Sequence, residues 1–259
     1  MSTDVMDETE LPQLTDADVF SPESDDTSTW LRSNGGSELA SSDGLLRDPV
    51  FPESEDIFRG IYTRAGTGFA ASEVIAISSA IEGEGKTSVA VGLAVTLAQD
   101  FPERRVLLVE TDLQRPVLAE DFDVAATPGL VDCLVEGAPL LSACRPTHIE
   151  NLHVVPAGEA ARVVRGRPLR SSNMALAVDD MRKSYHIVIL DLPAILANSD
   201  AVLITDLADS VLCVVRAGVT PTAMLTRAIE QVEESKFRGI VINGAHTAIP
   251  GWLRRMVGV

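Results

Sequence analysis

The chain has 259 residues, of which 46% are hydrophobic, enough for one α/β domain of ordinary size with an additional segment. Its net charge of −17 is concentrated in residues 1–58, where 15 acidic side chains accompany only Arg32 and Arg47. The rest carries 23 acidic and 19 basic side chains, so the charge pattern offers no broad basic face and argues against nucleic-acid binding.

Residues 1–51 are rich in Ser, Asp, Glu, Thr and Pro and show neither helical nor strand periodicity. Such a segment cannot bury enough apolar surface to offset the entropy of ordering, so we predict a disordered acidic tail. Its isolated apolar residues leave open whether it only solubilises the protein or carries short docking motifs. The folded domain is predicted over residues 52–259.

The domain is predicted to begin with a helix in SEDIFRGIYTRAG and then to alternate apolar runs with helical patterns. Nearly continuous apolar runs are typical of parallel strands covered on both faces. We therefore predict a three-layer α/β/α fold with a mostly parallel sheet. The predicted strands are Val74–Ser78, Val106–Glu110, Leu152–Pro156, Ile187–Asp191, Val211–Val215 and Ile240–Asn243. The predicted helices are Thr87–Gln99, Gly129–Val135, Met174–Ser184, Ala201–Ala208 and Pro221–Ser235.

The strongest motif joins the first of these strands to the helix that follows, in IAISSAIEGEGKTSVAVGLAVTLA. Gly83 and Gly85 permit close backbone approach to a triphosphate, and the helix N-terminus attracts negative charge. Lys86 can reach the β- and γ-phosphates, and the Thr87 hydroxyl can bind Mg²⁺. We expect ATP to be bound by Glu82, Gly83, Glu84, Gly85, Lys86, Thr87 and Ser88.

Carboxylates follow two of the predicted strands, in VLLVETDLQRP and HIVILDLPAIL. Because ligands of open α/β sheets bind at the carboxyl ends of the strands, Glu110, Asp112 and Asp191 are expected to face the phosphates. Asp112 and Asp191 are predicted to hold Mg²⁺ together with Thr87. Asp112 or Glu110 is the candidate base for an incoming hydroxyl group.

These motifs resemble those of the bacterial tyrosine kinases (BY-kinases) of capsule and exopolysaccharide synthesis, within the MinD/ParA-like P-loop ATPases. EGEGKTS is similar to the family's PGEGKST, VETDLQRP to IDADLRRP, and ILDLPAIL to IIDTPPVL. The resemblance covers about residues 52–250 and implies an ATP- and Mg²⁺-dependent protein tyrosine kinase. It also implies that Asn243, in GIVINGA, contacts the adenine base.

The resemblance further implies a membrane polysaccharide co-polymerase, or chain-length determinant protein, as partner. Family members carry an ExxRxxR helix that packs between subunits of a ring, and Asp56, Arg59 and Tyr62 occupy those positions here. This partial match leaves two alternatives, a subunit contact in a homo-oligomer or a helix that simply covers the sheet.

Three isolated cysteines, a polar N-terminus and the lack of a long apolar run favour a cytoplasmic protein that reaches the inner face of the plasma membrane only through a partner. The family's C-terminal tyrosine cluster is missing, since Tyr62 and Tyr185 are the only tyrosines. A phosphoacceptor would therefore be another protein, or Tyr62.

Two other functions stay open. The missing tyrosines and the altered Glu110 favour an ATP-bound switch that regulates the co-polymerase and hydrolyses ATP slowly. A partition or positioning ATPase of the MinD/ParA type is less well supported, because those proteins carry a second lysine at the position of Ile81.

Overall fold

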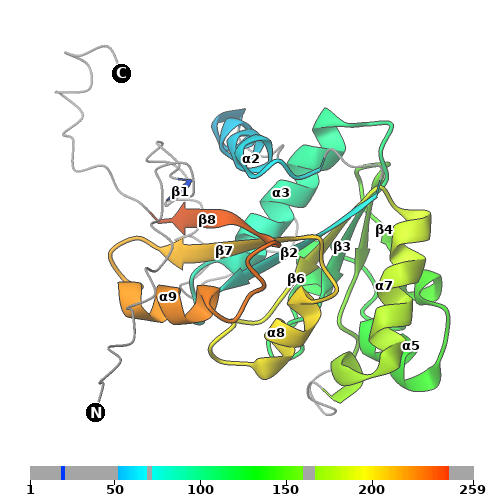
Figure 1. Cartoon of the computed structure of the whole chain (residues 1–259). Coiled ribbons are helices and arrows are strands. Elements are labelled where there is room, and N and C mark those ends of the chain that lie inside the picture. The colour runs from blue at the N-terminus through cyan, green and yellow to red at the C-terminus, as the bar shows by residue number, and fades with distance from the viewer. Residues whose placement is uncertain (1–18, 21–51, 69–71, 160–166, 245–259) are drawn as a thin grey trace, which may run out of the picture.

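An eight-stranded sheet forms the centre of the molecule in the computed structural model, which describes residues 19–20, 52–68, 72–159 and 167–244 (Figure 1). The strand order is β1-β8-β7-β2-β6-β3-β5-β4, and every pairing is parallel except β4 with β5. The strands are β1 (Val19–Phe20), β2 (Glu73–Ser79), β3 (Val106–Glu110), β4 (Arg145–Pro146), β5 (Leu152–Val155), β6 (Ile187–Asp191), β7 (Ser210–Arg216) and β8 (Phe237–Asn243).

Helices cover both faces of this sheet, because its central strands are apolar on both sides (Figure 1). Ile75 and Ile77 of β2 pack toward α2 (Pro52–Ala65), α3 (Lys86–Asp100) and the short α4 (Leu118–Asp121). Val74 and Ala76 pack toward the opposite layer. That layer contains α5 (Leu130–Glu136), α7 (Ser172–Ser184), α8 (Ser199–Thr205), α9 (Thr222–Ile229) and the 3-10 helices η2 (Leu140–Ala143) and η3 (Arg167–Arg170). The predicted three-layer fold is confirmed.

The sequence did not anticipate the two edge strands. β4 pairs with one edge, and β1 pairs with the other edge through Val19↔Ile240 and Phe20↔Val241. Val19–Phe20 belong to the segment predicted to be unstructured, and this prediction is wrong for those two residues. The reason is that an edge strand presents unpaired backbone N–H and C=O groups to which any extended segment can bind. Residues 1–18 and 21–51 lie outside the described residues.

Hydrogen bonds and an ion pair connect helix α2 to the end of α3. Arg59 Nε donates to Asp100 Oδ2 at 2.7 Å and Arg59 Nη2 donates to Asp100 Oδ1 at 2.6 Å. Tyr62 Oη donates to Asp100 Oδ2 at 2.7 Å, and the tyrosine is 5% exposed. Arg59 and Tyr62 thus both bind the last residue of α3 in the same chain.

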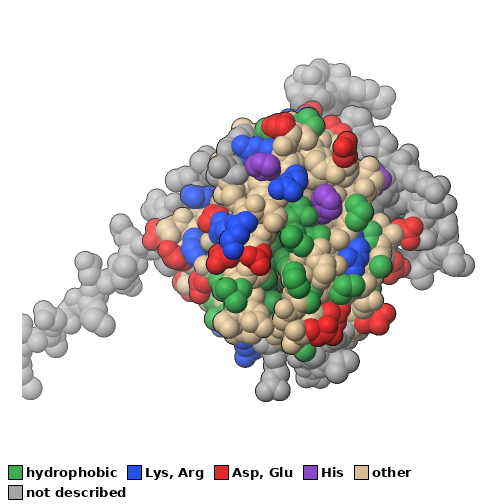
Figure 2. Space-filling model, turned by 90° about the vertical axis from the view of Figure 1, so that its right-hand side faces the viewer, with side chains coloured by type: hydrophobic (Ala, Val, Ile, Leu, Met, Phe, Trp, Pro, Cys, Tyr) green, Lys and Arg blue, Asp and Glu red, His purple; other side chains and the backbone are tan. Residues whose placement is uncertain are grey.

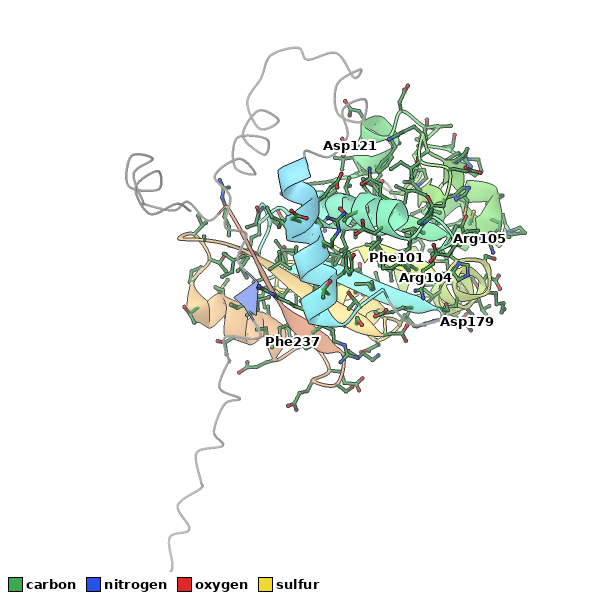
Figure 3. All side chains as sticks on the ribbon, turned by 90° about the horizontal axis from the view of Figure 1, so that it is seen from above. Phe101, Arg104, Arg105, Asp121, Asp179 and Phe237 are labelled. Atoms are coloured by element: carbon green, nitrogen blue, oxygen red, sulfur yellow. The ribbon has the colours of Figure 1, made fainter. Side chains whose placement is uncertain are left out.

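The outer face of α5, η2 and α7 exposes large apolar side chains among charged ones (Figure 2). They are Val135, Leu141 and Leu176. Figure 3 views the molecule from the side of α2, and its labels Phe101, Arg104 and Arg105 mark the end of α3 that lies away from Lys86. Within the described ranges, no helix is both long and apolar enough to cross a bilayer.

Candidate nucleotide site

The glycine-rich loop connects the end of β2 to the start of α3, as predicted. Gly83 and Gly85 have φ angles of +81° and +89°, a region that glycine adopts without steric cost. A Cβ atom on Gly85 would lie 2.1 Å from Asn243 Nδ2, so a larger residue at this position would displace that side chain. Lys86 begins a 15-residue helix, which directs its N-terminal N–H groups toward the loop.

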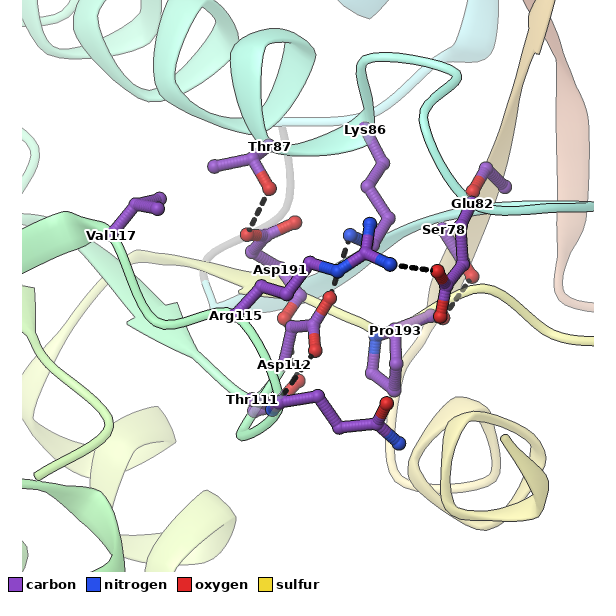
Figure 4. Close-up of polar contacts among 12 residues, drawn as sticks. Ser78, Glu82, Lys86, Thr87, Thr111, Asp112, Arg115, Val117, Asp191 and Pro193 are labelled. Atoms are coloured by element: carbon purple, nitrogen blue, oxygen red, sulfur yellow. Dashed lines mark hydrogen bonds and ion pairs between the residues drawn. The ribbon is translucent and has the colours of Figure 1, made fainter. Parts of the chain in front are cut away.

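Two polar contacts bring the predicted side chains together at this helix N-terminus (Figure 4). Lys86 Nζ donates to Asp112 Oδ2 at 2.8 Å, and Thr87 Oγ1 donates to Asp191 Oδ2 at 2.8 Å. The carboxylates come from neighbouring strands, because β3 and β6 pair in parallel and end at the same edge. This edge of the sheet therefore places a cation that can bind phosphate beside oxygen atoms that can bind a metal ion.

The environment of Asp191 suits a divalent cation. Its side chain is almost fully buried, and among the described residues its Oδ1 atom has no hydrogen-bond partner. Burial raises the pKa of this carboxyl to about 7, against the opposing effects of Lys86 and Thr87. A nearby cation would favour the charged carboxylate. Mg²⁺ binds through one or two carboxylates plus phosphate oxygens, so Thr87 and Asp191 fit this ion.

Both carboxylate oxygens of Glu110 accept backbone hydrogen bonds, and its expected role as a base stays a prediction. Its Oε1 accepts hydrogen bonds from the backbone N–H groups of Val117 and, at 2.9 Å, Leu118. Its Oε2 accepts from Ala157 N at 2.9 Å. Burial raises the pKa of Glu110, although these three donors favour its charged form. The side chain satisfies donors at the start of α4 and just after β5.

Replacing Glu110 by glutamine is therefore expected to affect stability more than chemistry. The amide NH₂ group would face a backbone donor, and the free energy of unfolding should fall by about 1–3 kcal/mol. Urea unfolding measures this change, with the exposed Glu103→Gln as the matched control. A Glu110→Gln protein with unchanged stability and lost ATP turnover would instead assign Glu110 to catalysis.

The other predicted residues lie around the same loop. Glu82 forms an exposed ion pair with Arg115 of the β3–α4 connection (Figure 4). Ser88 lies in the first turn of α3. Asn243 Nδ2 donates to the backbone carbonyl of Glu84 at 2.9 Å. Its predicted contact with adenine stays a prediction.

Two residues outside the predicted set, Thr220 and Arg216, bind the carboxylate of Glu84. An acidic side chain beside a phosphate site indicates that donors must hold it, but no local pattern in the sequence identifies these two residues.

Together, the glycine loop, Lys86, Thr87 and two carboxylates at the ends of adjacent parallel strands define the site of a P-loop ATPase. The AAA domain family model matches residues 72–241. The tyrosine-protein kinase YwqD of Bacillus subtilis (strain 168) is 29% identical over 221 residues, which cover 83% of this chain and 90% of YwqD. The succinoglycan biosynthesis transport protein ExoP of Rhizobium meliloti (strain 1021) is 32% identical over 176 residues. That match covers 66% of this chain but only 22% of ExoP.

Among solved structures, the chimerical protein CapA2B2 aligns with a TM-score of 0.67 and 26% identity, covering 80% of this chain and 92% of CapA2B2. The chain therefore belongs to the AAA domain family and, within it, to the bacterial tyrosine kinases.

Proposed function

We propose that this protein binds ATP with Mg²⁺ and transfers the γ-phosphate to a tyrosine of another protein, in exopolysaccharide or capsule biosynthesis. The observation that carries the proposal is the pair of contacts Lys86–Asp112 and Thr87–Asp191 at the start of α3. The relatives' names supply the acceptor class, since YwqD is named a tyrosine-protein kinase.

In the proposed reaction, each side chain has a separate task. Lys86 leaves Asp112 to bind the β- and γ-phosphates, and the loop N–H groups hold the remaining oxygens. Mg²⁺ supplies charge neutralisation on the phosphates when it is bound by Thr87 and Asp191. Asp112, released from Lys86, takes the tyrosine proton while the phenol oxygen bonds to the γ-phosphorus and the bond to the leaving ADP breaks.

The position of Tyr62 favours an acceptor on another molecule. Its hydroxyl binds Asp100 at the last residue of α3, and burial, together with Asp100, raises its pKa to about 12. Lys86 begins the same helix, so at 1.5 Å per residue Tyr62 lies about 20 Å from the phosphate loop. Tyr62 cannot reach its own active site while α2 is packed.

The second tyrosine is equally remote. Tyr185 is 7% exposed, its ring packs edge-on against His153, and the guanidinium of Arg105 lies 5.6 Å from the ring centroid. It precedes β6, whose far end carries Asp191, so the strand separates it from the site by about 20 Å. Both tyrosines lie at the amino end of the sheet, near Phe101 and Arg105 in Figure 3.

Incubation of the native protein with γ-labelled ATP, Mg²⁺ and a random Glu–Tyr copolymer tests this proposal. We expect label on the copolymer and none on the chain itself, and we expect Tyr62→Phe to transfer label at the same rate. Mass spectrometry of the protein after the reaction locates any modified residue. Phosphorylated Tyr62 or Tyr185 in the native chain would contradict the assignment of the acceptor to another molecule.

A second candidate function is an ATP-dependent switch that hydrolyses ATP without phosphorylating tyrosine. The burial of both tyrosines favours it, because no tyrosine of the chain is accessible as an acceptor. In the same experiment, phosphate release with no label on the copolymer would select this function.

We further propose a membrane polysaccharide co-polymerase as partner. ExoP is named a transport protein, and this chain matches only 22% of it. Binding to such a partner would bring this chain to the inner face of the plasma membrane. Formation of a homo-oligomer through α2 stays a prediction; the exposed side chain of Asp56 and the partly exposed Arg59 lie on this helix.

A further inference from the structure

Glu84 is an unusual residue in a loop that binds phosphates, because its negative charge opposes that of the ligand. It lies between the two left-handed glycines, yet it is only 1% exposed, whereas Glu82 and Gly83 are exposed. A buried carboxylate needs hydrogen-bond donors to offset the loss of hydration. The identity of those donors therefore indicates what Glu84 does.

The donors come from two directions. Oε2 accepts from Ile81 N at 2.8 Å, within the loop itself. Oε1 accepts from the hydroxyl of Thr220 and, at 3.4 Å, from the backbone N–H of Arg216. Arg216 ends β7 and Thr220 lies in the connection between β7 and α9, more than a hundred residues further along the chain. The side chain thus joins the phosphate loop to that connection.

Further hydrogen bonds extend this junction to Asn243 at the end of β8. Asn243 Nδ2 donates to Glu84 O at 2.9 Å, and Ala217 N donates to Asn243 O at 2.9 Å. Arg216 N also donates to Thr220 Oγ1 at 3.0 Å. Glu84, the β7–α9 connection and Asn243 therefore form one closed hydrogen-bonded unit, which we call the Glu84 junction.

The Glu84 junction lies on the opposite side of the phosphate loop from the catalytic carboxylates. In the sheet, β2 has β6 and then β3 on one side, with Asp191 and Asp112, and β7 and then β8 on the other. The γ-phosphate and its metal ion are expected to lie beside these carboxylates. The nucleoside of a bound triphosphate must then extend toward β7 and β8, where the junction forms the wall.

We propose that Glu84 is a positioning residue that holds this nucleoside-side wall in register with the phosphate loop, and that Thr220 is its partner. Through this wall, Glu84 and Thr220 make the affinity for a nucleoside triphosphate higher than the affinity for inorganic tripolyphosphate. The inference rests on the ATP-binding part of the proposed function and does not depend on which group receives the phosphate.

The test compares two ligands, ATP and inorganic tripolyphosphate, by titration calorimetry on the full chain. Thr220→Val is expected to raise the Kd of ATP by about fivefold to tenfold, as for the loss of one typical intramolecular hydrogen bond, and to change the Kd of tripolyphosphate less than twofold. Thr220→Ser, which keeps the hydroxyl, should restore ATP affinity. Thr222→Val, at an exposed position that does not touch Glu84, is the matched control.

A purely structural role would give a different pattern, since a collapsed loop would lose both ligands equally. Equal loss of ATP and tripolyphosphate in Thr220→Val, or no loss of either, would overturn the assignment. Glu84→Gln, which retains one acceptor oxygen, should reproduce the ATP-selective loss. A wild-type protein that binds neither ligand would overturn the proposed function itself, and this inference with it.

Discussion

Replacement of Lys86 by methionine is expected to weaken ATP binding by about 100-fold, or about 2.7 kcal/mol. Lys86 begins α3, its side chain is 13% exposed, and it is the cation that the site holds closest to the helix N-terminus. Methionine keeps the length of the side chain but removes the charge-assisted hydrogen bonds to phosphate. It also leaves Asp112 without its cation, so the negative charge of this carboxylate would repel a triphosphate. Titration calorimetry with ATP and Mg²⁺ measures the loss.

The matched control is Lys183→Met. Lys183 lies on α7 with its side chain 72% exposed, and it pairs with Asp180 at 2.9 Å. Exposed pairs of this kind contribute little to stability, so ATP affinity should stay at the wild-type value. Equal affinities of wild type and Lys86→Met would mean that the loop is not the phosphate site.

The second large effect is expected for Asp112→Asn, which should slow phosphate transfer by about 10²- to 10⁴-fold. Asparagine can accept the hydrogen bond from Lys86 but cannot take up a proton from an incoming hydroxyl. Asp112 is 7% exposed and lies at 2.8 Å from Lys86, so its removal also frees that lysine for phosphate. ATP affinity should therefore be retained or slightly increased. Single-turnover transfer to the Glu–Tyr copolymer, with ATP affinity measured in parallel, separates the two quantities.

Asp179→Asn controls for the change of charge, since Asp179 is exposed on α7 (Figure 3). This variant should transfer phosphate at the wild-type rate. The base assignment would fail if Asp112→Asn lost ATP binding and kept residual transfer per bound ATP.

The six central strands could be predicted from the sequence because each is a nearly continuous apolar run. Burial on both faces of a parallel sheet imposes that pattern, and β3 and β6 have the predicted bounds. The edge strands β1 and β4 have only two residues each and carry no periodic signal. The predicted last helix was too long, since α9 ends at Ile229 rather than near Ser235. Backbone pairing and tertiary contacts decide such short or terminal segments.

Part of the candidate site could also be predicted from the sequence, because the fold itself places those residues. Lys86, Thr87, Asp112 and Asp191 lie next to strand ends and a helix start, so topology alone brings them together. The side-chain direction of Glu110 depends on donors at Leu118 and Ala157, which no local pattern in the sequence connects to it. The link from Glu84 to Thr220 spans distant parts of the chain in the same way.

A crystal structure of the protein with a non-hydrolysable ATP analogue and Mg²⁺ tests the central claim most directly. We expect phosphate oxygens on the backbone N–H groups of Gly83–Ser88, and Lys86 turned from Asp112 to the β- and γ-phosphates. We also expect Mg²⁺ within reach of Thr87 Oγ1 and of Asp191, and the nucleoside on the side of β7 and β8. Phosphates bound away from this loop, or an Mg²⁺ ion that contacts neither Thr87 nor Asp191, would contradict this claim.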